Sequence, residues 1–354
     1  MKGWVNNVKK NRFEIDMCNG SIMDKLISFS LPLMVSGILQ LAFNAVDIIV
    51  VGRFSGSQAL AAVGSTTALI NVFTNLFIGI SLGANVLAAR FYAAGKDREM
   101  SETVHTSITL ALISGIMMAV IGVLLAKWAL EIMGTPDDVI GQSALYMRIY
   151  FMGMPFFMLY NYGAAILRAI GDTKRPLIFL IISGIANAAL NMTLVILFHM
   201  GVAGVAIGTI ISQLISCVLV LTCLYRSEGS YQLRFSKLKI NGAYMEQIFQ
   251  VGVPAGIQST VINFSNALLQ SSVNSFGSIA MAGNTASSNI EGFVYTAMNA
   301  VYQTNLSFTS QNLGGRKYSR INRIMYICLA VVTVVGITLG ITAVLAGDLL
   351  LGIY

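Results

Sequence analysis

The stretch LISFSLPLMVSGILQLAFNAVDIIVV, Leu26 to Val51, is predominantly apolar and carries one ionisable side chain, Asp47. A run of roughly 20 apolar residues is long enough to cross a bilayer as a helix. Ser36, Gln40, Asn44 and Asp47 follow one another at spacings of four, four and three, which places them on one face of a helix. The stretch therefore predicts a membrane-spanning helix with a single polar stripe.

Asp47 is the residue of this stretch that calls for a function. A carboxylate that faces lipid is costly, so it is expected to reach water or to face the protein interior. One interpretation places Asp47 at the outer end of the helix, in contact with headgroup water. Because the Asp side chain is short, we favour the other interpretation, in which Asp47 binds a cation or a proton inside the protein.

The composition places the whole chain in a membrane. It has 354 residues, of which 56% are hydrophobic and 10% charged, whereas soluble domains have about 25% charged residues. The four cysteines and two histidines show neither metal-ligand spacing nor a disulfide framework. We therefore expect an all-α integral membrane protein without a cofactor, and with no metal other than a coupling Na⁺.

The apolar runs predict nine spanning helices, and the basic residues between them predict their orientation. All but three of the 22 Lys and Arg residues lie in the N-terminal segment or in the loops after even-numbered helices. Basic residues prefer cytoplasmic loops, which puts the N-terminus of a multi-pass plasma-membrane protein in the cytoplasm. Basic residues spread over loops do not indicate a nucleic-acid partner. The expected helices cover 28–51, 59–89, 103–126, 147–167, 177–198, 202–225, 246–273, 281–311 and 322–346.

The chain repeats itself. LPLMVSGILQLAFNAVDIIVVGRFSG resembles VPAGIQSTVINFSNALLQSSVNSFGS, with Pro32 aligned to Pro254 and Phe54 to Phe276. Six helices separate the starts of the two copies, and an even number preserves orientation, so we predict two parallel-repeat lobes. The second lobe has only three helices, and we expect the chain to be truncated at its C-terminus. The predicted units are a cytoplasmic segment (1–27), a six-helix lobe (28–226), a cytoplasmic loop (227–245) and a partial second lobe (246–354).

Polar side chains also line the fifth to eighth predicted helices. They could form interhelical hydrogen bonds, at about 1 kcal/mol each, or they could line a water-filled cavity. Stripes on five helices together favour the cavity. Glu291 is the only other acid inside an apolar run, and it is open to a substrate-cavity role and to a structural one. The residues expected to line the cavity are Gln40, Asn44, Asn266, Gln270, Glu291 and Tyr295.

Four motifs give the chain a family resemblance. By its chemistry alone, LRAIGDTKRP (Leu167 to Pro176) is a solvated basic turn. Together with GVAGVAIGT (Gly201 to Thr209), Val46-Asp47 with Gly52, and QNLG (Gln311 to Gly314), it resembles the multidrug and toxic compound extrusion (MATE) transporters. The resemblance implies two six-helix lobes arranged in a V around a central cavity. It also implies a monomer that exports organic, often cationic, drug-like compounds in exchange for Na⁺ or H⁺.

The resemblance further implies a cation site in the first lobe. Carried over position by position, this site consists of Asp47, Asn187, Asn191 and Thr209. Some members have a second Asp where this chain has Asn191, so the site here has one negative charge fewer. Leu269 stands at the repeat partner of Asp47, so the sequence does not support a matching carboxylate site in the second lobe.

Other functions fit the sequence less well. A related flippase for lipid-linked oligosaccharides would need Lys or Arg inside the cavity to hold a pyrophosphate, and the cavity-facing helices have none. An intramembrane enzyme would need a nucleophile with a base or a metal pair, and neither pattern is present. A receptor that transports nothing is a further alternative, but a parallel repeat with an acidic stripe is typical of transporters.

Overall fold

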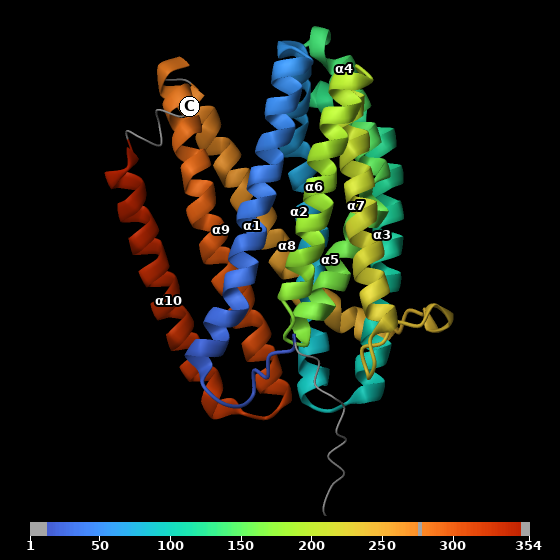
Figure 1. Cartoon of the computed structure of the whole chain (residues 1–354), viewed down its shortest axis with the longest axis vertical. Coiled ribbons are helices and arrows are strands. Elements are labelled where there is room, and N and C mark those ends of the chain that lie inside the picture. The colour runs from blue at the N-terminus through green and yellow to red at the C-terminus, as the bar shows by residue number, and fades with distance from the viewer. Residues whose placement is uncertain (1–12, 275–277, 348–354) are drawn as a thin grey trace, which may run out of the picture.

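The computed structural model describes residues 13–274 and 278–347, and this part of the chain contains helices and turns but no strand (Figure 1). Within these described residues, six helices are long and apolar enough to cross a membrane: α1, α2, α3, α6 with η1, α7 and α10. The predicted all-α, multi-pass fold is therefore confirmed. The elements are α1 (Ile22–Phe54), α2 (Ser57–Ala93), α3 (Asp97–Ile132), α4 (Asp137–Met152), α5 (Met154–Ala169), α6 (Lys174–Met192), η1 (Thr193–Leu197), α7 (Gly201–Arg226), η2 (Phe235–Lys237), α8 (Gly242–Asn274), α9 (Ser278–Gly314) and α10 (Tyr318–Leu345).

One predicted helix was wrong. The segment expected as a single helix over 147–167 consists of two helices, α4 and α5, which meet at Gly153. Pro155 lies at the start of α5, where its missing N–H costs no helical hydrogen bond. The predicted helix 103–126 was too short, since α3 runs from Asp97 to Ile132. Asp97 and Glu99 lie in its first turn, where carboxylates stabilise a helix, so the helix continues beyond its apolar run.

The two copies of the repeat pack against each other reciprocally. By the sequence alignment α1 corresponds to α8 and α2 to α9. In the structure α1 packs on α9, α2 packs on α8, and α2 also packs on α9. Exchanging the two copies converts the first contact into the second, as expected for parallel repeats related by a two-fold axis. Pro32 and Pro254 both lie inside their helices, α1 and α8.

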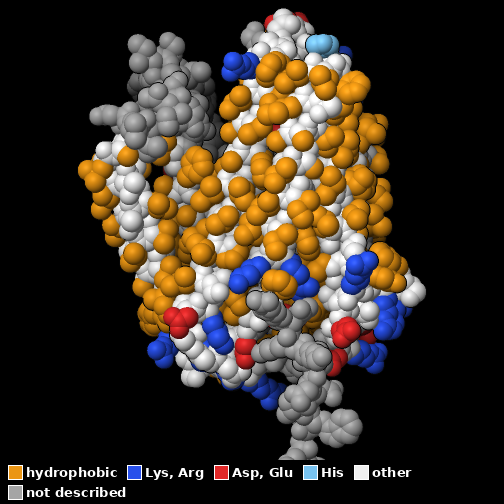
Figure 2. All heavy atoms as spheres, in the orientation of Figure 1, with side chains coloured by type: hydrophobic (Ala, Val, Ile, Leu, Met, Phe, Trp, Pro, Cys, Tyr) orange, Lys and Arg blue, Asp and Glu red, His pale blue; other side chains and the backbone are white. Residues whose placement is uncertain are grey.

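The helices enclose two apolar cores. The larger one lies among α2 to α7 and includes the fully buried Phe151 and Met158. The smaller one joins the start of α1 to α9 and α10 through residues such as Phe29 and Phe308. Figure 2 shows apolar side chains along the outer faces of the helices and most visible Lys and Arg side chains at one end. This end, which holds the α2–α3 and α9–α10 turns, is called the basic end below.

The Leu167 to Pro176 connection lies at the basic end, and its interpretation as a solvated turn was wrong. Asp172 is fully buried. Its Oδ1 accepts the backbone N–H of Lys174 and of Arg175, both at 3.1 Å, and its other oxygen pairs with the Arg175 guanidinium. Burial raises the pKa of the Asp172 carboxyl, and the adjacent guanidinium acts in the opposite direction. The turn is buried because the segment before α1 covers it: Ile15 N donates to Gly171 O at 3.2 Å.

Candidate functional site

The four residues predicted to form the cation site lie together in the structure. Asn191 Nδ2 on α6 donates to Asp47 Oδ1 on α1 at 2.5 Å and approaches Asn187 Oδ1 at 3.4 Å. Asn187 Nδ2 in turn lies 3.5 Å from Thr209 Oγ1 on α7. A continuous line of polar contacts therefore crosses three helices, which we call the Asp47 cluster. Asp47 points toward the asparagines of α6 and not away from them.

Helix geometry and two close approaches explain this arrangement. Asn187 and Asn191 are four residues apart, so they project from the same face of α6, and both are buried. Opposite them, Gly208 of α7 has no side chain, and a Cβ at that position would overlap Asn191 Oδ1. The glycine therefore leaves the space that the Asn191 amide occupies. Gly184 does the same for α1, because a Cβ there would overlap the Phe43 ring.

The Asp47 cluster presents oxygen atoms between α1, α6 and α7. Asn191 Oδ1 is buried and has no hydrogen-bond partner among the described residues. Together with the Asp47 carboxylate and Thr209 Oγ1, it supplies the hard oxygen ligands that suit a hard cation. The carboxylate could equally hold a proton. Among residues 13–274 and 278–347 no three His, Cys, Asp or Glu side chains come together, so the single carboxylate with amide and hydroxyl oxygens is the donor set at this position.

Sequence reasoning missed two tyrosines near the cluster. Tyr146 and Tyr150 of α4 lie close enough to Asp47 for its charge to act on their hydroxyls. Their rings stack with centroids 6.0 Å apart. The signal was available as a Tyr-x-x-x-Tyr spacing, which puts both rings on one helix face. The helix expected there began at residue 147, whereas α4 begins at Asp137, so Tyr146 fell outside the predicted helix and the pair was not assigned to the site.

The residues predicted to line a substrate cavity lie on three helices, α1, α8 and α9. Gln40 and Asn44 on α1, Asn266 on α8, and Glu291 and Tyr295 on α9 are all exposed. No hydrogen bond joins these five side chains to one another within the described part of the chain. The side chain of Gln270 lies outside the described residues. Their exposure is compatible with a wet surface between the halves, and their assignment to substrate stays a prediction.

Comparison with known proteins gives the family. The family described as MatE matches residues 32–193 and 254–354. The "Probable multidrug resistance protein YoeA" of Bacillus subtilis (strain 168) is 30% identical over 314 residues, covering 86% of this chain and 67% of that protein.

Solved structures share the fold. An outward-facing multidrug resistance MATE family transporter of the MOP superfamily superposes with a TM-score of 0.89 at 19% identity, covering 97% of this chain and 76% of that one. A MOP superfamily transporter from Pyrococcus furiosus, described as having a binding pocket of reverse polarity, gives a TM-score of 0.90 at 19% identity, with the same coverage. The matched residues, the relative and the shared fold lead to one conclusion: the chain belongs to the MATE family of transporters.

Proposed function

We propose that this chain acts as a secondary active multidrug efflux transporter that exports organic, often cationic, compounds by antiport with Na⁺ or H⁺. Family membership and the names of its relatives support export of drugs. The observation that carries the coupling proposal is the 2.5 Å contact between Asp47 and Asn191. This contact places the only carboxylate of the first apolar stretch among interior oxygen atoms, where an exchangeable cation could bind.

The Asp47 cluster is connected to the second half of the molecule through α1. α1 contacts both α6 and α9. With Asp47 ionised and empty, Asn191 donates to its carboxylate. A proton or Na⁺ on that carboxylate removes the charge that Asn191 stabilises, and this changes how tightly α1 is held to α6. A bound cation shifts the equilibrium between inward- and outward-open states only if its affinity for the two differs, and the movable contact between α1 and α6 supplies such a difference.

The orientation belongs to the same proposal. The basic end of the molecule would face the cytoplasm of a plasma-membrane protein, with the N-terminus on that side, because basic residues prefer cytoplasmic loops. The substrate path would lie between the halves, along α1, α2, α8 and α9. The alternative of a lipid-linked oligosaccharide flippase is less favoured, because residues 26–51, 59–89, 246–273 and 281–311 contain no Lys or Arg to bind a pyrophosphate.

The test is efflux of a cationic dye by cells that produce Asp47→Asn. Because the amide cannot release a proton or neutralise a cation, we expect at least a tenfold loss of gradient-driven efflux, equivalent to about 1.4 kcal/mol or more. Asp24→Asn is the matched control, since it makes the same chemical change on an exposed residue of the same helix. Efflux by Asp47→Asn equal to that of Asp24→Asn would reject the assignment. Imposing Na⁺ and pH gradients separately identifies the coupling ion.

A further inference from the structure

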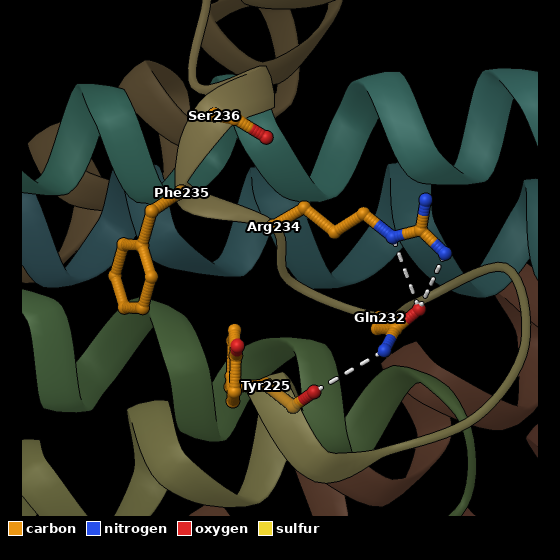
Figure 3. Close-up of a pocket in the computed structure, with 5 residues that line it drawn as sticks. All are labelled: Tyr225, Gln232, Arg234, Phe235 and Ser236. Atoms are coloured by element: carbon orange, nitrogen blue, oxygen red, sulfur yellow. Dashed lines mark hydrogen bonds between the residues drawn. The ribbon is translucent and has the colours of Figure 1, made fainter.

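A second site lies at the basic end, where α7 stops and the following loop folds back on it. A cavity of about 440 Å³ is lined there by Tyr225, Gln232, Arg234, Phe235 and Ser236 (Figure 3). A second cavity of about 230 Å³ shares Tyr225 and Phe235 with the first and is otherwise lined by Val218, Leu221 and Thr222 of α7. The two form one groove with a polar end and an apolar end, called the α7 groove.

The side chains of the polar end hold one another in place. The Tyr225 and Phe235 rings stack with centroids 5.8 Å apart and planes 27° apart. Gln232 Nε2 donates to Tyr225 O at 3.3 Å, and its Oε1 accepts Arg234 Nε and Nη2 at 3.2 and 3.1 Å. Figure 3 shows the two rings on one side and the guanidinium above Gln232 on the other. The Arg234 guanidinium is therefore held in position by a neutral amide and keeps its full positive charge.

The loop that carries these residues is anchored to its neighbours. Arg234 N donates to His105 Nε2 of α3 at 3.1 Å, and Leu233 N donates to Leu224 O at 3.0 Å. The Tyr231 hydroxyl donates to Glu14 Oε1 at 2.6 Å. Burial and this hydrogen bond raise the pKa of Tyr231 to about 12, so the hydroxyl remains a donor at neutral pH. The groove is thus preformed.

The charge of the α7 groove and its position on the molecule indicate which ligand it binds. Residues 226–239 contain four basic residues and one acid, Glu228. No carboxylate lies within ion-pair distance of Arg234 in the part of the chain that the structure describes. Val218, Tyr225 and Phe235 are each more than half exposed, so the apolar end opens on the outer face of α7, where lipid would surround it. Aromatic and basic side chains are typical of the membrane–water interface.

We propose that the α7 groove binds one anionic phospholipid from the adjacent leaflet. The phosphate would accept hydrogen bonds from Arg234 and from the Ser236 hydroxyl, and an acyl chain would lie along Val218 and Leu221. A soluble anion has no acyl chain to pack against the apolar end of the groove. A zwitterionic lipid has no net negative charge, so Arg234 would contribute less to its binding. That this leaflet is the cytoplasmic one rests on the orientation given in the proposed function. The binding of the lipid does not depend on that orientation.

The test is lipid retention by the detergent-purified full chain, measured by native mass spectrometry with phosphatidylglycerol, phosphatidylcholine and glycerol 3-phosphate as separate probes. Basic residues near an anionic surface contribute about fivefold each to binding. We therefore expect Arg234→Gln to weaken phosphatidylglycerol binding about fivefold and to weaken phosphatidylcholine binding less. Arg323→Gln is the matched control, because it removes an exposed charge at the same end of the molecule, on α10.

Three outcomes would overturn the proposal. They are equal retention of the two lipids by the unmodified chain, equal effects of Arg234→Gln and Arg323→Gln, and glycerol 3-phosphate binding as strong as that of the phospholipid. The last outcome would identify a site for a soluble anion. Because lipid binding is measured without transport, a negative result here leaves the efflux proposal standing, and a loss of efflux in Asp47→Asn does not affect this test.

Discussion

The two reciprocal contacts between the halves of the molecule use different chemistry. Where α2 meets α8, Gly79 and Gly83 lie against Gly252 and Gly256, and a Cβ at any of the four would overlap or crowd backbone atoms of the opposite helix. Where α1 meets α9, side chains make the contact, including Phe29 and Phe308, whose rings meet edge to face at 5.7 Å. The sequence repeat relates these two contacts, yet only one brings backbones together.

This difference suggests different mechanical roles. Small residues let helix backbones approach closely in membranes, where packing is the main source of association, and the separation of α2 and α8 cannot shrink further. Side chains between α1 and α9 can change rotamers as the helices shift. We therefore expect the α2–α8 contact to act as a fixed pivot and the α1–α9 contact to adjust when the Asp47 cluster changes its occupancy.

The largest effect is expected from added volume at the pivot. In Gly252→Leu the new side chain meets Ile80 Cα at 2.5 Å and Gly79 O at 3.0 Å, and backbone cannot move aside as a side chain can. We expect a loss of about 3 kcal/mol or more in stability, seen as a lower thermal midpoint in detergent. Gly340→Leu is the control, since no atom lies within 4 Å of a Cβ there. Equal midpoints for the two variants would contradict a backbone contact.

A smaller loss of stability is expected from removing side-chain volume at the α1–α9 contact. Phe308 is fully buried in the core shared by α1, α9 and α10. Phe308→Leu leaves a cavity and removes the edge-to-face contact with Phe29, at a cost of about 2 kcal/mol. Phe293→Leu, at an exposed position of the same helix, should leave the thermal midpoint unchanged. If both variants unfold at the same temperature, Phe308 does not carry the contact.

The contact between α2 and α9 offers a test of a buried hydrogen bond. Ser307 Oγ donates to Asn85 Oδ1 at 3.1 Å, and Asn85 Nδ2 donates to Ala165 O at 2.8 Å. Ser307→Ala leaves the Asn85 oxygen without this donor, at a cost of about 1–2 kcal/mol. In the double variant with Asn85→Leu that oxygen is absent, so the further effect of Ser307→Ala on the midpoint should shrink. Strict additivity of the two substitutions would show that the residues are not coupled.

The smallest effect is expected at Gly37, where α1 meets a side chain of α9. A Cβ at Gly37 would overlap Thr296 Cγ2, which can move by rotation about χ1. The overlap is offset by a gain of about 1 kcal/mol in helix propensity, so Gly37→Ala should change stability by less than about 1 kcal/mol. Adding Thr296→Ser removes the overlapping methyl and should make Gly37→Ala stabilising. A destabilised double variant would mean that the contact involves backbone, as at α2–α8.

Comparison of prediction and structure separates two kinds of information. The spanning helices and Asp47 followed from the sequence, because an apolar run in lipid must satisfy its backbone hydrogen bonds within a helix. The partners of Asp47 came from a family resemblance, since composition and spacing do not say which helices are neighbours. The buried Asp172 was misread, because its charge and its turn residues suit a solvated loop until the segment around Ile15 covers them.

By itself, the sequence determined the membrane class, the parallel repeat and the position of the one acid in the first stretch. These depend on local hydrophobicity and spacing, which each segment carries with it. Only the tertiary structure decided that Gly79 and Gly83 face Gly252 and Gly256, that Tyr146 and Tyr150 come within electrostatic range of Asp47, and that α4 and α5 divide at Gly153. These features depend on what lies opposite each residue, and packing between segments distant in the chain determines that.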